Sequence, residues 1–249
     1  GNDTKQKRTG AVYKLGGAYT RVLDLLYPKV CPFCGEISPE GICTECKKKI
    51  VYIGQPRCMR CGKPIKDEYK EYCSDCAKRT SYITQGRSLW LHKEPVSTAI
   101  YKFKYNNKRS WGELFAAEMA EYYADQVKKW EIEEIIPIPL HKSRKRKRGY
   151  NQAGIIAKHL SEKTGVPFAS DVLFRVKKTT AQKQLERQER MGNLQGAFAV
   201  SGAWKPAVNV LLIDDIYTTG ATVEQAAKIL KKAGVQNVYF LTISIGQGI

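Results

Sequence analysis

The 249-residue sequence has no long apolar run, few acidic residues, and no cysteine outside one region. No apolar run approaches the length of a membrane-spanning helix and no signal peptide is visible, so neither membrane insertion nor secretion is predicted. All eight cysteines lie between positions 31 and 76. Because the remainder of the chain contains none, a secreted scaffold held together by disulfides is disfavoured.

Acidic residues number 24 against 42 Lys and Arg, which gives a net charge of +18. A surplus of this size predicts a polyanionic partner, nucleic acid first, and charge kept only for solubility is the alternative. Clustering favours a partner, since six of the seven residues at 142–148 are basic. A second, looser group comprises Lys177, Lys178, Lys183, Arg187 and Arg190.

The cysteines form four Cys-x-x-Cys pairs, a spacing that suits tetrahedral thiolate binding of zinc. Two structural zinc ions are therefore expected, in two tandem zinc ribbons. The repeated pattern of pairs favours sequential grouping, in which each ion takes two consecutive pairs, and a cross-braced grouping that joins pairs one and three stays open. The ligands are Cys31, Cys34, Cys43, Cys46, Cys58, Cys61, Cys73 and Cys76.

A hydrophobic content of 43% predicts a folded core, and the length suits one α/β domain with a smaller module. We expect a tail with an amphipathic helix at 1–28, a double zinc ribbon at 29–80 and an α/β domain at 81–249. Strands and helices alternate after residue 130, which favours a parallel sheet covered on both faces. Strands are predicted at 86–92, 135–139, 172–175, 197–200, 208–213 and 238–243, helices within 96–130 and at 150–163 and 223–233, and loops at 140–148 and 177–195.

The run from Val210 to Thr222 is the most informative stretch. Four apolar residues lead into Asp214 and Asp215, a Thr/Gly loop follows, and a helical pattern begins at Val223. Unpaired N–H groups at a helix N-terminus bind anions, and parallel sheets bind ligands at the carboxyl ends of their strands. An anion site beside two carboxylates suits a molecule with both a phosphate and sugar hydroxyls. A strand–loop–helix with chance acids is the alternative.

This run resembles the phosphoribosyl pyrophosphate (PRPP) loop of type I phosphoribosyltransferases. The resemblance implies that Asp214 and Asp215 hold the ribose hydroxyls and act in catalysis. It also implies that the loop wraps the 5-phosphate. The loop residues are Thr218, Thr219, Gly220, Ala221 and Thr222.

About residues 22–245 resemble the ComF family of competence proteins. The likeness rests on the cysteine pairs, on Ile138–His141, on Arg146–Gln152 and on Asp214–Thr222, in family order. It implies an α/β fold: a parallel-sheet type I phosphoribosyltransferase domain with an N-terminal cysteine-rich zinc-ribbon module.

The resemblance implies that Pro139–Arg144 is the pyrophosphate loop, where Lys142 and Arg144 would bind pyrophosphate. Contact between this run and nucleic-acid phosphates is the alternative. The segment 177–195 matches the flexible hood, with Arg187 and Arg190 placed to bind phosphate; a solvated loop is the alternative. The residues assigned to nucleic acid are Arg146, Lys147, Arg148, Tyr150, Asn151 and Gln152, although Asn151 also suits a helix cap.

The implied chemistry is displacement at the anomeric carbon of PRPP, with magnesium on the pyrophosphate and ribose hydroxyls. The resemblance further implies a cytoplasmic competence factor that binds single-stranded DNA during natural transformation. A helicase or another competence protein is the expected partner. The alternative is an active phosphoribosyltransferase of nucleotide salvage or modification without a DNA role. The residues leave turnover and the acceptor open.

Overall fold

We analysed a computed structural model of the chain, which describes residues 28–175 and 198–246. The chain divides into two compact units, residues 1–48 and 49–249. The elements within the described ranges are α2 (Thr44–Lys49), α3 (Ser74–Ala77), β1 (Gln85–Leu91), α4 (Val96–Tyr105), α5 (Trp111–Lys129), β2 (Glu134–Pro137), α6 (Lys142–Arg148), α7 (Gln152–Thr164), β3 (Leu173–Arg175), β4 (Phe198–Val200), β5 (Asn209–Tyr217), α9 (Ala221–Ala233) and β6 (Asn237–Ile245).

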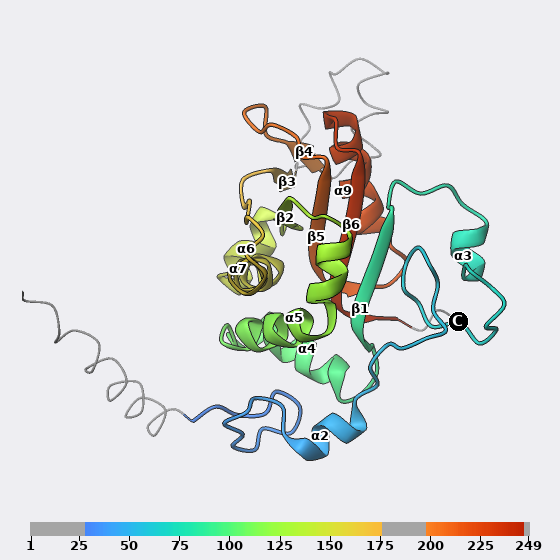
Figure 1. Cartoon of the computed structure of the whole chain (residues 1–249). Helices are drawn as coiled ribbons and strands as arrows, with labels where there is room; N and C mark the ends of the chain where they lie inside the picture. The colour runs from blue at the N-terminus through green and yellow to red at the C-terminus, as the bar shows by residue number, and fades with distance from the viewer. Residues whose placement is uncertain (1–27, 176–197, 247–249) are drawn as a thin grey trace, which may run out of the picture. The chain divides into compact units, whose positions relative to one another are not determined.

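A four-stranded sheet in the order β1-β6-β5-β2 forms the centre of the second unit (Figure 1). All three strand pairings are parallel, as the sequence predicted. Residues 209–213 of β5 are all buried, which is typical of a parallel strand covered on both faces. No helix of the described ranges is long and apolar enough to cross a bilayer.

Helices cover both faces of the sheet. Helix α7 packs on β5 and β2, and α5 packs on α7 and β1. On the other face, α9 buries Val223, Ala226 and Leu230 against β5 and β6. The predicted parallel-sheet α/β class is therefore confirmed.

Strand β5 runs further than the sequence pattern indicated. Asp214 pairs with Thr242 and Ile216 with Ser244 of β6, so the strand ends at Tyr217 and the two aspartates lie within it. Parallel pairing uses only backbone groups and therefore tolerates carboxylates near the strand end. The acids still lie near the carboxyl edge of the sheet, which is where ligands bind in such folds.

The basic run, predicted as a loop, is the helix α6, so that prediction was wrong. His141 caps it, its side chain accepting from the Ser143 N–H, and Gly149 ends it in a left-handed conformation. The cations of its last turn also lie at the negative end of the helix dipole. These local signals outweigh the repulsion among like charges.

The second cysteine group lies inside the second unit. Its four cysteines share one core with β5, β6 and α9. Gly62 has a φ of +74°, and a Cβ there would lie 2.7 Å from the Gly86 carbonyl oxygen of β1. The backbone after this Cys-x-x-Cys pair therefore touches the strand directly, and only glycine fits.

Strands β3 and β4 form a separate antiparallel pair at the positions predicted for the two flanking strands. The amphipathic helix predicted within residues 1–28 lies, up to residue 27, outside the described residues, as does the segment 177–195.

Candidate functional site

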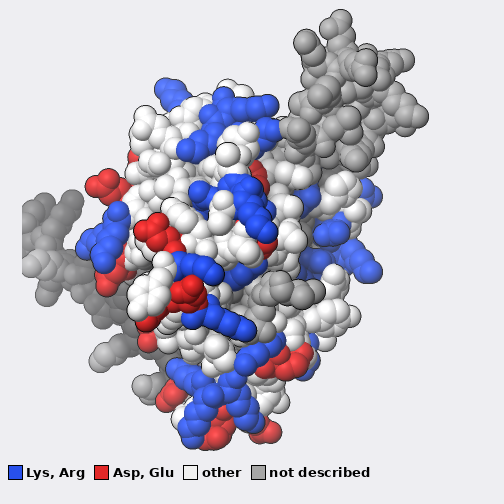
Figure 2. Space-filling model, turned by 90° about the vertical axis from the view of Figure 1, so that its right-hand side faces the viewer, with Lys and Arg blue, Asp and Glu red and all other residues white. Residues whose placement is uncertain are grey.

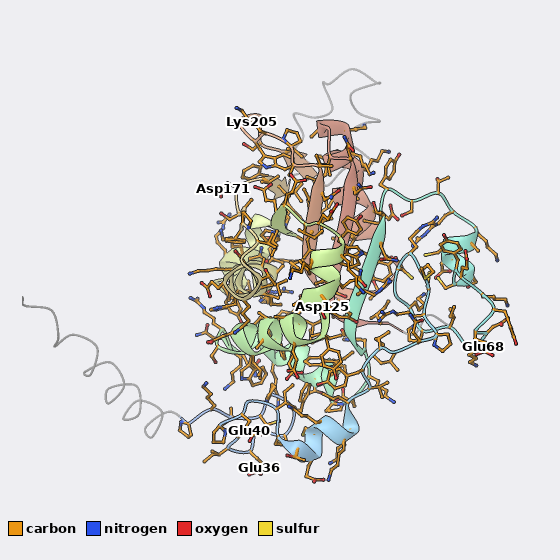
Figure 3. All side chains as sticks on the ribbon, in the orientation of Figure 1. Glu36, Glu40, Glu68, Asp125, Asp171 and Lys205 are labelled. Carbon is orange, nitrogen blue, oxygen red and sulfur yellow. The ribbon has the colours of Figure 1, made fainter. Side chains whose placement is uncertain are left out.

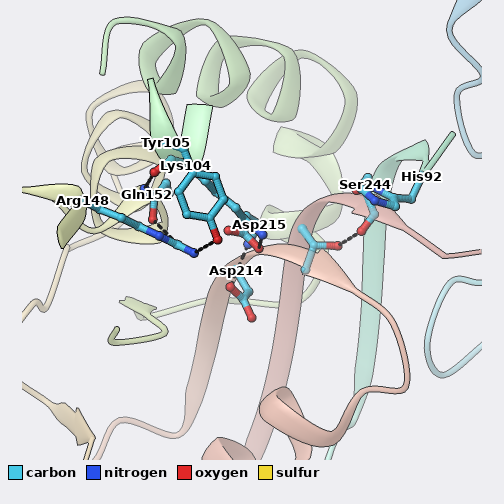
Figure 4. A network of polar contacts seen from close by, with 9 residues as sticks. His92, Lys104, Tyr105, Arg148, Gln152, Asp214, Asp215 and Ser244 are labelled. Carbon is cyan, nitrogen blue, oxygen red and sulfur yellow. Dashed lines mark hydrogen bonds and ion pairs between the residues drawn. The ribbon is translucent and has the colours of Figure 1, made fainter. Parts of the chain in front are cut away.

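The two aspartates of β5 meet different partners (Figure 4). The Asp215 carboxylate forms an ion pair of 3.1 Å with Lys104 of α4, and both side chains are less than 20% exposed. Asp214 Oδ1 accepts a 2.8 Å hydrogen bond from the Asp215 N–H. Because Lys104 engages Asp215, Asp214 is the carboxylate better placed to receive a ligand's hydroxyls.

The pKa of Asp214 is raised from its ordinary value of 3.8 to about 7. Burial is the main cause and the charge of Asp215 is the second, while the Asp215 N–H, Lys104 and Arg175 act in the opposite direction. Asp125 and Asp171, which are labelled in Figure 3, are by contrast exposed. An acid with so high a pKa is typical of a functional site.

Arg175 places further positive charge near Asp214. Arg175, at the end of β3, donates a 3.0 Å hydrogen bond from Nε to the carbonyl oxygen of Pro139. The pKa of Arg175 is lowered by burial; Asp214 opposes the shift and Arg144 adds to it, so both lie within electrostatic reach. Arg144, predicted to bind pyrophosphate, thus lies within electrostatic reach of Arg175, which in turn acts on Asp214. Nothing is described of the Lys142 side chain, and Arg187 and Arg190 lie outside the described residues.

The Thr/Gly loop joins β5 to α9. Thr218 and Thr219 are exposed, and Gly220 occupies the N-cap of α9 without any side-chain cap. Gly220 has a φ of +80°, and a Cβ there would lie 2.3 Å from the Tyr217 hydroxyl. Position 220 therefore requires glycine for two reasons: its positive φ, and the lack of space for a Cβ. The first N–H groups of α9 have no intrahelical partner, which suits an anion.

The residues assigned to nucleic acid divide into two sets. Arg146 and Lys147 are exposed on α6, and Arg148 is half-buried. Tyr150 and Gln152 are only 6% and 1% exposed, which contradicts their assignment to base contacts.

Packing accounts for this correction. The Tyr150 hydroxyl donates to the Phe103 carbonyl oxygen. Gln152 Oε1 accepts a hydrogen bond from Arg148, and Gln152 Nε2 donates one to the Lys104 carbonyl oxygen. Asn151 holds the N-cap position of α7, but its amide donates to the Ile138 carbonyl at 3.1 Å instead of capping.

The cysteines lie in two groups of four, in sequential order. Within each group the four Sγ atoms lie within 4.8 Å of one another, and the cross-braced grouping does not occur. The first Cys-x-x-Cys turn of each group has the same geometry: the Gly35 N–H donates to the Cys31 carbonyl and the Gly62 N–H to the Cys58 carbonyl, both at 2.9 Å. Four thiolates at this spacing fit tetrahedral zinc. The first group is Cys31, Cys34, Cys43 and Cys46, and the second is Cys58, Cys61, Cys73 and Cys76.

Three residues of this region carry no motif in the sequence. Lys104 is 111 positions from its partner Asp215, and His92, which lies 2.9 Å from Ser244 Oγ, follows β1 without any local pattern. Burial and Lys104 lower the pKa of His92. For Arg175 the sequence offered one weak indication of a site role, since it is a cation at the end of a predicted strand that borders a polar segment.

Comparisons with known proteins agree with this arrangement. Residues 22–77 match the double zinc ribbon domain family. Competence protein F of Haemophilus influenzae is 33% identical over 208 residues, covering 81% of this chain and 89% of that protein. Competence protein ComFC of Streptococcus pneumoniae is 28% identical over 199 residues, covering 79% and 84%.

Two more distant similarities were found. DNA utilization protein YhgH of Salmonella typhimurium is 25% identical over 224 residues, covering 86% of this chain and 96% of that protein. A purine phosphoribosyltransferase structure from Pyrococcus horikoshii Ot3 has 16% identity and a TM-score of 0.33, covering 53% and 83%, which is too weak to support an argument. With its zinc-ribbon cysteines, parallel-sheet domain and extensive identity to competence protein F, the chain belongs to the ComF family of competence proteins.

Proposed function

We propose that this protein is a cytoplasmic factor of DNA uptake that binds PRPP through Asp214–Thr222 and binds single-stranded DNA through its basic surface. The observation that carries the PRPP proposal is the half-buried acid pair one short loop before the N-terminus of α9, where Gly220 offers no side-chain cap and the Ala221 N–H has only a 3.4 Å bond to Thr219 Oγ1. A phosphate on the α9 N-terminus and ribose hydroxyls on Asp214 would occupy neighbouring parts of one molecule.

Magnesium fits this site only together with the ligand. Within the described ranges, groups of three or more potential ligands occur only as the two cysteine clusters, and Asp215 is already paired with Lys104. The protein would supply carboxylate oxygen atoms, and the remaining oxygen ligands would come from pyrophosphate, ribose hydroxyls and water. Bound magnesium would neutralise the pyrophosphate.

The residues of the chain would bind and orient PRPP. The raised pKa of Asp214 leaves its carboxyl partly protonated near neutral pH, so it can donate to as well as accept from a hydroxyl. Arg144 would attract the pyrophosphate by charge and by hydrogen bonds. If displacement occurs, the negative charges of Asp214 and Asp215 would stabilise the oxocarbenium-like ribose.

Isothermal titration with PRPP and magnesium tests this half of the proposal. We expect binding by the native protein and none by Asp214→Ala/Asp215→Ala. Asp125→Ala, which removes an exposed carboxylate, is the control and should bind as the native protein does. Undiminished binding by the double variant would refute the site.

The DNA half of the proposal rests on α6 and the adjoining aromatic side chains of α4. Arg144, Lys145, Arg146 and Lys147 are all exposed. Tyr101 and Tyr105 are 62% and 48% exposed, and their ring centroids lie 4.8 Å apart.

Arg148 joins these two elements. Its guanidinium lies 4.7 Å from the Tyr105 ring centroid, and Nη2 donates to the Tyr105 hydroxyl at 2.9 Å. A basic surface with stackable rings suits single-stranded nucleic acid. On the face shown in Figure 2, by contrast, acidic side chains interrupt the basic ones.

Fluorescence anisotropy of a labelled oligothymidylate over a range of salt concentrations tests the DNA surface. Arg146→Gln/Lys147→Gln should lower the slope of log affinity against log salt by about 1.4, because each neutralised phosphate of a single strand contributes about 0.7. Lys128→Gln/Lys129→Gln, which removes the same charge from α5, should leave the slope unchanged. Equal effects of both pairs would show a nonspecific charge contribution and refute the surface.

The names of the relatives favour this function over nucleotide salvage, since they are competence and DNA utilization proteins. A helicase or another competence protein remains the proposed protein partner. The alternative, an active phosphoribosyltransferase without a DNA role, predicts PRPP turnover with a small acceptor and no oligonucleotide binding.

A further inference from the structure

The segment that follows the last cysteine reaches the Thr/Gly loop. We define residues 77–83 as the strap. Within it, Arg79 donates from Nη1 to the Thr219 carbonyl oxygen at 3.1 Å and from Nη2 to the Tyr217 hydroxyl at 3.2 Å. One guanidinium thus holds the backbone of the loop and the side chain that precedes it, although 140 positions separate Arg79 from Thr219.

The strap also holds the helix that follows the loop. The Tyr82 N–H donates to Glu224 Oε2 of the first turn of α9 at 2.9 Å, and the Ser81 hydroxyl donates to Glu224 Oε1. Ile83 is buried in the core that contains Tyr217 and Val223. The strap therefore contacts the end of β5, the loop and the start of α9, which are the three parts of the proposed phosphate site.

The second cysteine group holds the other end of the strap. Arg60, which lies within a Cys-x-x-Cys turn, donates from Nη1 to the Cys76 carbonyl at 2.7 Å and to the Arg79 carbonyl at 3.1 Å. The Arg60 carbonyl in turn accepts from the Gly86 N–H of β1 at 2.6 Å. All four cysteines of the group are buried. Metal binding to so small a segment supplies much of its folding free energy.

Arg79 fixes the one peptide of the loop that is easiest to rotate. The freedom of φ that glycine has is available at Gly220, whose φ is +80°, so the peptide between Thr219 and Gly220 could flip. In a trans peptide the C=O and N–H point in opposite directions. By holding the Thr219 carbonyl, Arg79 therefore also sets the direction of the Gly220 N–H, a donor for an anion.

We infer that the second cysteine group, through the strap, positions the phosphate-binding loop, and that Arg79 is the positioning residue. The inference rests on the proposed PRPP site and adds to it a structural role for the second zinc. No cysteine would touch the ligand. A zinc ion on Cys58, Cys61, Cys73 and Cys76 would act only by keeping residues 77–83 in place.

Titration with PRPP and magnesium distinguishes a positioning role of Arg79 from an effect of its positive charge alone. Arg79→Gln should weaken PRPP binding about tenfold, which corresponds to about 1.4 kcal/mol. Its melting temperature and zinc content should stay unchanged, because Arg79 is an exposed residue. Arg79→Lys keeps the positive charge but loses the planar guanidinium that donates two hydrogen bonds, so its PRPP binding should be weakened to a similar extent. Lys78→Gln removes the same charge from the adjacent exposed residue and should bind normally.

Hydrogen exchange of peptides covering residues 217–224 tests positioning without any ligand. Exchange should be about tenfold faster in Arg79→Gln and native-like in Lys78→Gln. Cys73→Ser, which removes a ligand of the second group, should also accelerate it, whereas Cys34→Ser of the first group should not. If the native protein fails to bind PRPP, the proposed function fails, and exchange still decides the role of Arg79. Native exchange rates in Arg79→Gln, or full PRPP affinity in Arg79→Lys, would overturn the inference.

Discussion

Replacing Asp214 by Asn should stabilise the folded protein in a pH-dependent way. In the folded state the pKa of Asp214 is about 7 rather than 3.8, mainly because of burial and then because of Asp215. At pH values between 3.8 and 7, the Asp214 carboxyl is deprotonated in the unfolded chain but still protonated in the folded chain. The free energy of unfolding therefore falls by about 1.4 kcal/mol for each unit by which the pH rises within this range.

The full effect above pH 7 is at most about 4 kcal/mol, and about 2 kcal/mol after allowance for partial contact with water. Asn has nearly the shape of Asp, carries no charge and can still accept the Asp215 N–H through its Oδ1. Asp214→Asn should thus be about 2 kcal/mol more stable than the native protein at pH 8. Its advantage should shrink steadily toward pH 5.

Urea denaturation of both proteins at several pH values between 5 and 8 measures this difference. Asp125→Asn is the matched control, since it changes an exposed carboxylate of α5 and should show no pH-dependent gain (Figure 3). A difference that stays constant with pH, or a variant that is less stable at pH 8, would refute the reasoning. The predicted gain would come with loss of PRPP binding, since the unfavourable burial of Asp214 serves the site.

Three further results are expected. Gly220→Ala should lower the free energy of unfolding by about 1–3 kcal/mol, because its φ is positive and its Cβ would meet the Tyr217 hydroxyl; denaturation and PRPP titration measure both losses. Metal analysis should find two zinc ions per native chain and one in Cys58→Ser, and an unchanged count would contradict the role of Cys58 as a ligand. Lys104→Met should destabilise the fold by about 3 kcal/mol in thermal melts, since it leaves Asp215 buried without its cation; a native melting temperature would show that the pair contributes nothing.

Much of the sheet could be predicted because its strands carry local signals. The apolar run 210–213 and the terminating glycine Gly234 located β5 and the end of α9 to within a few residues. The cysteine spacing predicted two metal sites, but only the folded chain shows which pairs share one. The basic run was misjudged because like charges suggested a loop, whereas the caps at His141 and Gly149 make it a helix.

The partners of the site could not be predicted, because each joins residues distant in the sequence. Nothing around Lys104 indicates that it faces Asp215, and nothing after Cys76 indicates that Arg79 reaches Thr219. Tyr150 carries an aromatic ring beside a basic run, a pattern that suits nucleic acid. Its burial depends on Phe103, which packs on it from α4 at a centroid distance of 6.2 Å. Such contacts follow from the tertiary packing alone.

A crystal structure with PRPP and magnesium tests the central claim most directly. We predict the 5-phosphate on the N–H groups of residues 218–222 and the ribose hydroxyls against Asp214 and Asp215. A 5-phosphate bound on α6, or ribose hydroxyls that face away from both carboxylates, would contradict it.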